Sequence, residues 1–196
     1  MHLNTSAVAA FFDGRAEHWD LHSAPKEAVI NTILDSAGVS PGVSVLDIGC
    51  GTGVLFPYYL SRGVFHVTGV DLSPGMIRRA KEKFGNDPRV SLICADASNA
   101  SFAPHDACVV YNALPHFQSA QALIEALSKA LVPGGRLTIA HGDSRQTINA
   151  RHNSHASDVS HNLMPAVELA ELFEPLFEVD AVHDAEDYYL VSGVLK

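Results

Sequence analysis

The feature that most constrains the fold is an apolar stretch that runs directly into three glycines at alternate positions. The stretch begins at Val45, and the segment 45–53 reads VLDIGCGTG. Glycine lets a chain turn sharply and lets its backbone approach a ligand, because no Cβ is in the way. The pattern predicts a buried parallel strand, then a tight turn, with a ligand pocket at the carboxyl end of the strand.

A second acidic residue favours a nucleotide-type pocket at the same edge of the sheet. Asp71 follows another apolar run, residues 65–70. Its separation from the glycines suits a carboxylate that accepts hydrogen bonds from two ribose hydroxyls. A helix expected to start near Gly53 would offer unpaired N–H groups to an anionic group.

The register of the glycines selects among nucleotide ligands. Gly49, Gly51 and Gly53 give G-x-G-x-G, and Val54 stands where a dinucleotide fingerprint would have its third glycine. The loop also has no basic residue to hold a diphosphate. A ligand with adenosine and a small zwitterionic tail therefore fits better than a nicotinamide dinucleotide. S-adenosylmethionine (SAM) is such a ligand.

Five segments in order resemble the motifs of class I SAM-dependent methyltransferases. They correspond to the glycine-rich motif, the ribose-binding motif, the adenine-side motif, the fourth strand with its exit, and the turn before the fifth strand: 45–53, 69–73, 94–97, 106–113 and 133–137. The remaining similarity is to the quinone-biosynthesis-like type 11 group. The resemblance implies an enzyme that transfers a methyl group from SAM to a small-molecule acceptor.

The resemblance also implies which residues surround the cofactor. Asp47, Gly49 and Gly51 would surround the methionine moiety, with Asp47 favouring its ammonium group. Asp71 would take both ribose hydroxyls, and Asp96 would accept a hydrogen bond from the adenine amino group. The full cofactor-binding set implied is Trp19, Asp47, Gly49, Cys50, Gly51, Gly53, Asp71, Leu72, Met76, Asp96, Ala97 and Asn112.

Strands and helices alternate through the middle of the chain. This order predicts a Rossmann-like, doubly wound α/β fold with helices on both faces. The sheet is expected to have seven strands, mostly parallel with an antiparallel last strand. The expected strands are 43–48, 65–70, 89–94, 106–111, 135–141, 179–183 and 188–194, and the expected helices between and beside them are 53–62, 74–84, 119–131 and 165–173.

A length of 196 residues without an internal repeat or linker predicts one domain, residues 1–196. Its parts are N-terminal helices at 1–40, a SAM-binding core at 43–141, a polar, histidine-rich insertion at 142–164, and a C-terminal helix with the last strands at 165–196. The insertion follows the fifth strand, where class I methyltransferases often build acceptor pockets, so the resemblance implies that it forms the acceptor pocket.

The N-terminal region is expected to hold one helix over residues 7–21, capped by Thr5 or Ser6, and a second opened by Pro25. Residues 12–20 resemble the Phe-Asp-x-x-Ala-x-x-Tyr-Asp segment of quinone-biosynthesis-like methyltransferases, with Trp19 at the tyrosine position. The resemblance implies a lid over the cofactor. The alternative is an amphipathic helix that only packs on the domain.

Histidines are the candidate catalytic residues. His116 follows the fourth strand and His141 ends the fifth, so both are expected to face the cleft. In the insertion, His152, His155 and His161 are candidates for contact with substrate. The candidate ligands of a divalent metal are His141, His152, His155, Asp158 and His161. The alternative for the insertion is a polar surface segment with solvated histidines.

Charge and composition narrow the partners. The net charge is −9, from 13 Lys+Arg against 22 Asp+Glu, and no basic cluster marks a nucleic-acid-binding face. No apolar run is long enough to cross a membrane. The three cysteines make no disulfide framework, which favours a cytoplasmic location, and Cys94 and Cys108 are expected to be buried. A homodimer is left open.

Three rival functions remain at this point. One is a SAM-binding module that transfers no methyl group. Another is a methyltransferase that uses a metal bound by the histidine-rich segment. A nicotinamide oxidoreductase fits least, because of the glycine register.

Overall fold

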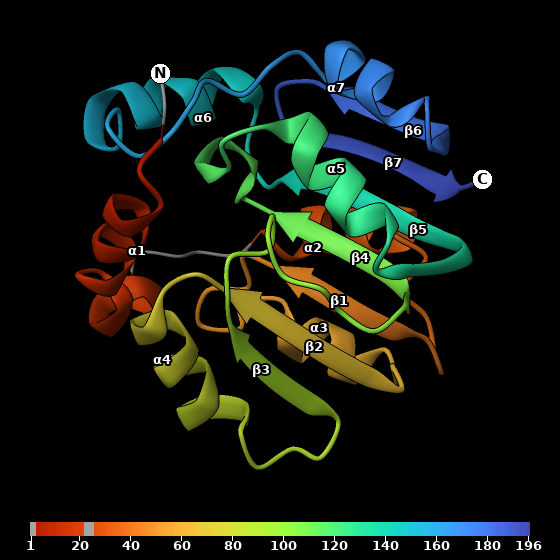
Figure 1. The fold of residues 1–196 in the computed structure, drawn as a ribbon, viewed down its shortest axis with the longest axis horizontal. Coiled ribbons are helices and arrows are strands. Elements are labelled where there is room, and N and C mark those ends of the chain that lie inside the picture. The colour runs from red at the N-terminus through yellow and green to blue at the C-terminus, as the bar shows by residue number, and fades with distance from the viewer. Residues whose placement is uncertain (1–2, 22–25) are drawn as a thin grey trace.

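The computed structural model describes residues 3–21 and 26–196, and it places one seven-stranded sheet between helices (Figure 1). The strand order is β3-β2-β1-β4-β5-β7-β6. The strands are β1 (Ser44–Ile48), β2 (His66–Asp71), β3 (Val90–Cys94), β4 (His105–Tyr111), β5 (Leu131–His141), β6 (Phe177–Asp184) and β7 (Tyr189–Leu195). The helices are α1 (Thr5–Asp13), α2 (Glu27–Ser36), α3 (Phe56–Ser61), α4 (Pro74–Phe84), α5 (Ala120–Ser128), α6 (Arg145–His155) and α7 (Ala166–Phe173), with short 3-10 helices η1 (Ala16–Leu21) and η2 (Leu114–His116).

The predicted fold class is confirmed. Strands β1 to β5 pair in parallel, whereas β7 runs antiparallel between β5 and β6. The order reverses beside β1, because β2 lies on one side of it and β4 on the other. In open α/β sheets such a switch point leaves a crevice beyond the carboxyl ends of the strands.

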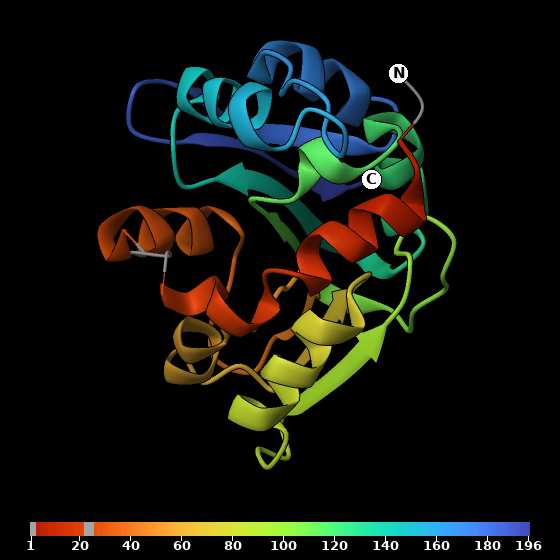
Figure 2. The same ribbon diagram turned by 90° about the vertical axis from the view of Figure 1, so that its left-hand side faces the viewer.

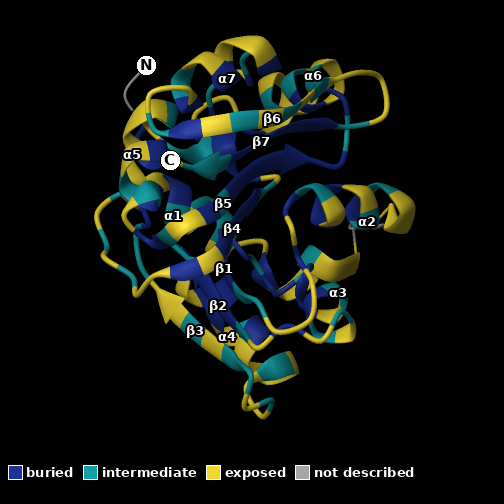
Figure 3. Ribbon diagram, turned by 90° about the vertical axis from the view of Figure 1, so that its right-hand side faces the viewer, coloured by how far each residue is buried: buried dark blue, intermediate teal, exposed yellow. Residues whose placement is uncertain are grey.

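Two apolar layers cover the two faces of the sheet, and neighbouring residues of one strand belong to different layers. Leu46 of β1 packs in the layer that includes α5 and α7, whereas Val45 packs in the layer that includes α2 and α3. Figure 3 shows buried strands with α2 and α3 together on one side. This alternation follows from the two-residue period of a strand.

Serine caps start three of the helices. Ser73, Ser119 and Ser144 each accept a hydrogen bond from a backbone N–H in the first turn of α4, α5 and α6 respectively. Such a cap satisfies a donor that has no partner within the helix. The cap at Ser73 matters for the site, because Ser73 comes two residues after Asp71 and so fixes α4 beside the expected ribose position.

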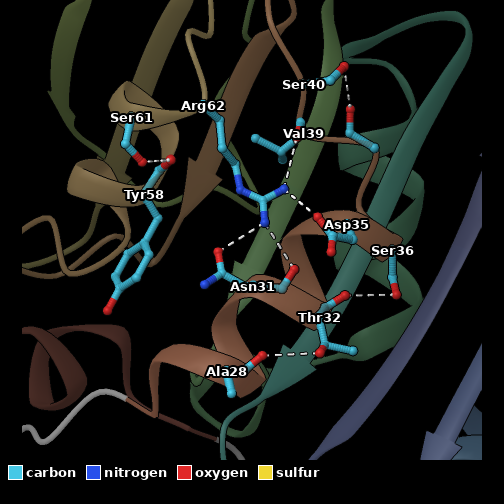
Figure 4. Close-up of polar contacts among 11 residues, drawn as sticks. Ala28, Asn31, Thr32, Asp35, Ser36, Val39, Ser40, Tyr58, Ser61 and Arg62 are labelled. Atoms are coloured by element: carbon cyan, nitrogen blue, oxygen red, sulfur yellow. Dashed lines mark hydrogen bonds and ion pairs between the residues drawn. The ribbon is translucent and has the colours of Figure 1, made fainter.

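A half-buried arginine, Arg62, joins α3 to α2 (Figure 4). The Arg62 guanidinium donates to the Asp35 carboxylate (2.6 Å), to the Val39 carbonyl (3.1 Å) and to Asn31 (3.0 Å to its side-chain oxygen). Only 19% of the Arg62 side chain is exposed. These bonds join α3 to α2, the two helices that cover one face of β1.

Several predicted boundaries are wrong. The helix expected over 7–21 breaks after Asp13, and its cap is Asn4 rather than Thr5 or Ser6. Helix α3 begins at Phe56 rather than near Gly53, because the chain is still turning at the third glycine. The insertion contains a regular helix, α6. Pro25 lies outside the described residues.

Cys94 is a further correction. It is exposed, whereas Cys50 and Cys108 are buried. The prediction of a buried Cys94 rested on the general tendency of cysteine to be buried, whereas Cys94 ends β3, which is an edge strand of the sheet. Within residues 3–21 and 26–196, no helix combines the length and the apolar character needed to cross a membrane.

Candidate active site

One cavity of about 1500 Å³ lies at the carboxyl ends of β1, β2, β4 and β5. Pockets for small ligands usually measure roughly 300–1,000 Å³, so this cavity has room for a cofactor and a second molecule. Most of the residues predicted to bind cofactor or substrate line it: Trp19, Asp47, Gly49, Cys50, Gly51, Asp71, Leu72, Met76, Asp96, Ala97, Asn112, His116, His141, His152 and His155. Gly53, Asp158 and His161 are not part of the lining.

The three glycines build the turn after β1. Gly49, Gly51 and Gly53 all have positive φ, at 69°, 56° and 83°. A Cβ on Gly49 would stand 2.6 Å from the Ala113 Cβ, so the exits of β1 and β4 approach more closely than any side chain permits. Gly53 instead packs against Phe84, where a Cβ would stand 2.8 Å from the ring. Gly53 therefore shapes the turn without touching the cavity.

Asp71 fixes the glycine turn and stays available to a ligand. Its Oδ2 accepts from the Gly51 N–H and its Oδ1 from the Ser73 N–H, both at 2.8 Å. Burial raises the pKa of this carboxyl, and the two backbone hydrogen bonds oppose the rise. Each carboxylate oxygen can accept a further hydrogen bond. The carboxylate can thus accept from a diol while it holds the turn.

Asp47 is a buried acid with an unsatisfied oxygen. It is 2% exposed, and its Oδ2 has no hydrogen-bond partner among the described residues. Burial and then the nearby Asp71 charge raise its pKa to about 8, although the neighbouring Tyr59 hydroxyl acts in the opposite direction. A cationic group placed here would relieve the unfavourable burial of the carboxylate. The ammonium group of a SAM molecule fits that requirement.

Two apolar side chains and a carboxylate line another part of the same cavity: Leu72, the buried Met76 and Asp96. The Asp96 oxygens accept from the Ser98 N–H (3.0 Å) and from the Asn99 side-chain amide (2.8 Å). These residue types suit a flat ring with an exocyclic donor, which is the chemistry of adenine.

The N-terminal segment forms a roof over the cavity; we use "roof" for α1 with η1, residues 5–21. Figure 2 shows α1 crossing in front of the strand ends. The Asp13 carboxylate accepts hydrogen bonds from the Ser73 hydroxyl and from the Gly75 N–H at the start of α4. The Asp20 carboxylate accepts from the Thr52 hydroxyl in the glycine turn (2.6 Å).

Trp19 lies on the inner side of this roof. Its indole nitrogen would stand 3.7 Å from a Cβ on Gly51, and its ring packs edge-on against Phe12 with centroids 5.6 Å apart. Trp19 also lines the cavity. This placement fits both sequence-based expectations, a segment that covers a cofactor and a helix that only packs on the domain, so the lid stays a prediction.

Two histidines, one at the end of η2 and one at the end of β5, line the other half of the cavity. His141 is 1% exposed, and both of its ring nitrogens lack a partner among the described residues. Burial lowers its pKa to about 3. His116 donates from Nδ1 to the Val159 carbonyl (2.9 Å), and burial lowers its pKa to about 4. Both imidazoles are therefore neutral near pH 7, with lone pairs available to a bound molecule.

The metal site considered from the sequence does not form. In the parts of the chain that the structure describes, no group of three or more His, Cys, Asp or Glu side chains could hold a metal ion. His152 lies beside His116, with ring centroids 5.0 Å apart, and His155 lines the cavity from an exposed position. Asp158 and His161 lie outside the cavity lining, because α6 ends at His155 and the chain turns away.

Sequence reasoning missed several lining residues. Tyr111, from the end of β4, lines the cavity, and burial raises its pKa to about 12. Asp143, Lys26 and Arg151 line it as an ion-paired group, and Arg15 lines it from the roof. Tyr111 could have been found from its position at a strand exit. The charged residues come from three separate segments, and only tertiary packing brings them together.

A family model and several curated proteins match this chain. A family model described as a methyltransferase domain matches residues 45–135. The chain is 31% identical over 140 residues to the malonyl-(acyl-carrier protein) O-methyltransferase of Priestia megaterium, which is 69% of this chain and 51% of that protein. It is also 31% identical over 139 residues to the demethylmenaquinone methyltransferase of Corynebacterium kroppenstedtii, which is 67% of this chain and 58% of that protein. The chain spans about half the length of the curated relatives that it matches.

Solved structures share the fold. The N-methyltransferase NodS from Bradyrhizobium japonicum WM9, in complex with S-adenosyl-L-homocysteine, has a TM-score of 0.74 at 19% identity, over 96% of this chain and 98% of that one. At that identity the likeness concerns the fold alone. Matches of this breadth agree with the five ordered motifs, all of which fall within or beside residues 45–135.

Proposed function

Because this chain belongs to the SAM-dependent methyltransferase family, we propose that it transfers a methyl group from SAM to a small-molecule acceptor. The observation that carries the proposal is the shared cavity. The same cavity is lined by the glycine turn, Asp71 and Asp96 and by the half-buried His116 and the buried His141. A cofactor in the first half would thus face a second molecule in the other half.

The residues of the first half would hold the cofactor. Asp71 would accept from the ribose hydroxyls, Asp96 from the adenine amino group, and Asp47 would pair with the ammonium group. Cys50, Gly53, Ala97 and Asn112 contribute mainly through backbone shape; the Asn112 side chain accepts from the Gly142 N–H (2.9 Å) and so joins the exits of β4 and β5. SAM supplies an electrophilic methyl carbon that is bonded to a sulfonium sulfur. This sulfur is the leaving group, and it needs no activation.

The residues of the second half would orient the acceptor. Alignment of the two reactants can lower a barrier by roughly 7–11 kcal/mol, so positioning accounts for much of such a reaction. We propose His141 and His116 as the groups that contact the acceptor, and the roof as the element that excludes water. An acidic protein with no basic face favours a small molecule over a nucleic acid. A cytoplasmic location and a homodimer also stay proposals.

Calorimetry with S-adenosyl-L-homocysteine tests the cofactor half directly. We expect binding in the micromolar range, unchanged by prior treatment with a chelator. Incubation with SAM and a panel of small hydroxylated, amine and thiol compounds, followed by measurement of S-adenosyl-L-homocysteine, then tests transfer. Binding without any transfer across the panel would favour the SAM-binding module. A failure to bind either molecule would overturn the proposal.

A further inference from the structure

The two halves of the cavity differ in charge. The cofactor half contains the carboxylates Asp47, Asp71 and Asp96. In the acceptor half the only carboxylate among the described lining residues is Asp143, and it is already paired with Lys26 (2.6 Å) and Arg151 (2.7 Å). Lys26, Arg151 and Arg15 are positively charged, and among the described lining residues Asp143 is the one negative residue beside them. The acceptor half therefore has an excess of positive charge. This excess disfavours an acceptor that carries a cation.

Arg15 is the cation available to a ligand. It lies on the roof, lines the cavity and has no carboxylate partner within the described residues. Its guanidinium lies 3.4 Å from the centroid of the Phe11 ring, and its Nη1 donates to the Phe11 carbonyl (3.0 Å). The contact orients the planar group and leaves its other N–H donors free. A guanidinium held in this way suits a carboxylate.

A row of rings leads inward from Arg15. Phe11 packs edge-on against Phe12 (5.2 Å between centroids), and Phe12 packs edge-on against His116 (4.8 Å). His152 follows at 5.0 Å from His116. Such a row offers ring faces and edges to a flat molecule, since aromatic pairs favour stacked and edge-on contacts.

The inner end of this row requires a hydrogen-bond donor. His116 uses Nδ1–H on the Val159 carbonyl, which fixes the tautomer and leaves a lone pair on Nε2. His141, fully buried nearby on β5, has no partner for either ring nitrogen. Leaving buried polar groups without partners costs free energy that a bound donor recovers. A hydroxyl group is the simplest ligand for such an acceptor.

We propose that the methyl acceptor is a hydroxylated aromatic acid, with its ring along Phe12, its carboxylate on Arg15 and its hydroxyl on His116. The assignment rests on the proposed function. In the reaction the hydroxyl oxygen bonds to the methyl carbon, while the carbon–sulfur bond breaks and its electron pair stays on sulfur. The hydroxyl proton passes to Nε2 of His116 and then to water. The products are the methyl ether, S-adenosyl-L-homocysteine and one proton.

Three related probes test the acceptor class on protein saturated with S-adenosyl-L-homocysteine. They are para-hydroxyphenylacetate, phenylacetate, which lacks the hydroxyl, and tyramine, which replaces the carboxylate by a cation. We expect para-hydroxyphenylacetate to bind most tightly in calorimetry. Its advantage over tyramine should be roughly 10- to 100-fold, the loss typical of a charge-assisted hydrogen bond, and its advantage over phenylacetate roughly 2- to 10-fold, the loss typical of a neutral hydrogen bond. Equal affinities, a preference for tyramine, or no binding of para-hydroxyphenylacetate would each overturn the proposal.

Matched variants locate the two contacts. Arg15→Gln should weaken para-hydroxyphenylacetate and leave S-adenosyl-L-homocysteine unaffected, whereas Arg78→Gln, at an exposed arginine outside the cavity, should change neither. His116→Asn keeps a donor for the Val159 carbonyl but loses the acceptor at Nε2. This variant should therefore bind para-hydroxyphenylacetate no more tightly than phenylacetate. His116→Gln, which returns an oxygen near that position, should restore part of it.

The two proposals fail differently. If S-adenosyl-L-homocysteine does not bind the unaltered protein, the proposed function falls and the acceptor class falls with it. If S-adenosyl-L-homocysteine binds but Arg15→Gln and His116→Asn leave the order of the three probes unchanged, only the acceptor class is wrong. Binding of S-adenosyl-L-homocysteine by each variant also shows that the variant is folded.

Discussion

At the scale of single residues, Asp71 is the most sensitive test of the cofactor half. Asp71→Asn removes the negative charge and replaces one acceptor oxygen by a donor, so one of the groups that donate to Asp71, the Gly51 N–H or a ribose hydroxyl, loses its charged acceptor. We expect S-adenosyl-L-homocysteine to bind roughly 10- to 100-fold more weakly, because a hydrogen bond to a charged group is lost. Asp35→Asn, at the ion pair with Arg62 outside the cavity, is the control and should leave the affinity unchanged. Equal losses in the two variants would point to general destabilisation instead.

Because Asp47 has a raised pKa, we expect it to release a proton when a cofactor with an ammonium group binds. With a pKa near 8 the ligand-free carboxyl is mostly protonated at pH 7. An ammonium group beside it would favour the ionised form, so binding should release close to one proton, about 0.9 for a group of that pKa. The observed binding enthalpy should then depend on the ionisation enthalpy of the buffer, and Asp47→Asn should abolish that dependence. An enthalpy independent of buffer would separate Asp47 from the ammonium group.

The residue scale also shows where sequence reasoning succeeds. Asp47, Asp71 and the glycines were predictable because strand periodicity and glycine geometry act locally along the chain. Arg15 carried no comparable signal, since its position over the cavity depends on where α1 docks. Gly53 was predicted to bind the cofactor because it belongs to the glycine motif. In the structure it packs against the Phe84 ring instead, where no side chain would fit.

At the scale of elements, the roof is attached to the body chiefly by side chains. Asp13→Ala removes the acceptor used by the Ser73 hydroxyl and the Gly75 N–H, so the roof should open more often. We expect faster dissociation of S-adenosyl-L-homocysteine in stopped-flow measurements and faster proteolysis within residues 5–21, with little change in Tm. Glu17→Gln lies on the same segment but pairs only with exposed arginines, so it should behave like the unaltered protein. Unchanged dissociation in Asp13→Ala would mean that the roof does not gate the site.

The same elements show what the sequence could not predict. The core strands followed from apolar runs between turn residues, and β1, β2 and β4 lie within a residue or two of the predicted ranges. The break after Asp13 had no local signal, because Gly14 keeps a helical conformation. Contacts with α4 set that break. Helix α6 was hidden because its polar surface lacks the apolar periodicity that marks a packed helix.

At the scale of the whole molecule, the buried titratable groups predict a stability maximum near pH 6.5. Unfolded histidines take up protons below about pH 6.5, but His116 and His141 resist protonation down to about pH 4 and 3, so their contribution is lost as pH falls. Asp47 acts oppositely, since its unfolded form ionises above about pH 4 while the folded form stays protonated to about pH 8.

The direction of the slope follows from the groups whose pKa values are shifted by burial. Below pH 6.5 the histidines with lowered pKa values outweigh the two carboxyls with raised pKa values, Asp47 and Asp71, so the free energy of unfolding should fall as the pH falls. The histidines with lowered pKa values are His105, His116, His141, His152 and His161. Above pH 6.5 Asp47 should lower the free energy of unfolding as the pH rises toward 8. Urea unfolding of the ligand-free protein at pH 4.5, 6.5 and 8 measures both slopes. A maximum at pH 8 or at pH 4.5 would contradict the assignment of these groups as neutral and buried.

Ser73 donates hydrogen bonds to both Asp71 and Asp13, and this affects which cofactor analogues could bind. Its N–H donates to Asp71, while its hydroxyl donates to Asp13 on the roof. A synthetic methyl donor with a bulky substituent on the ribose would therefore disturb the attachment of the roof as well as its own binding. A donor enlarged at the sulfonium would point toward flexible aromatic side chains instead. Selective alkylation with this protein should begin from substituents on sulfur.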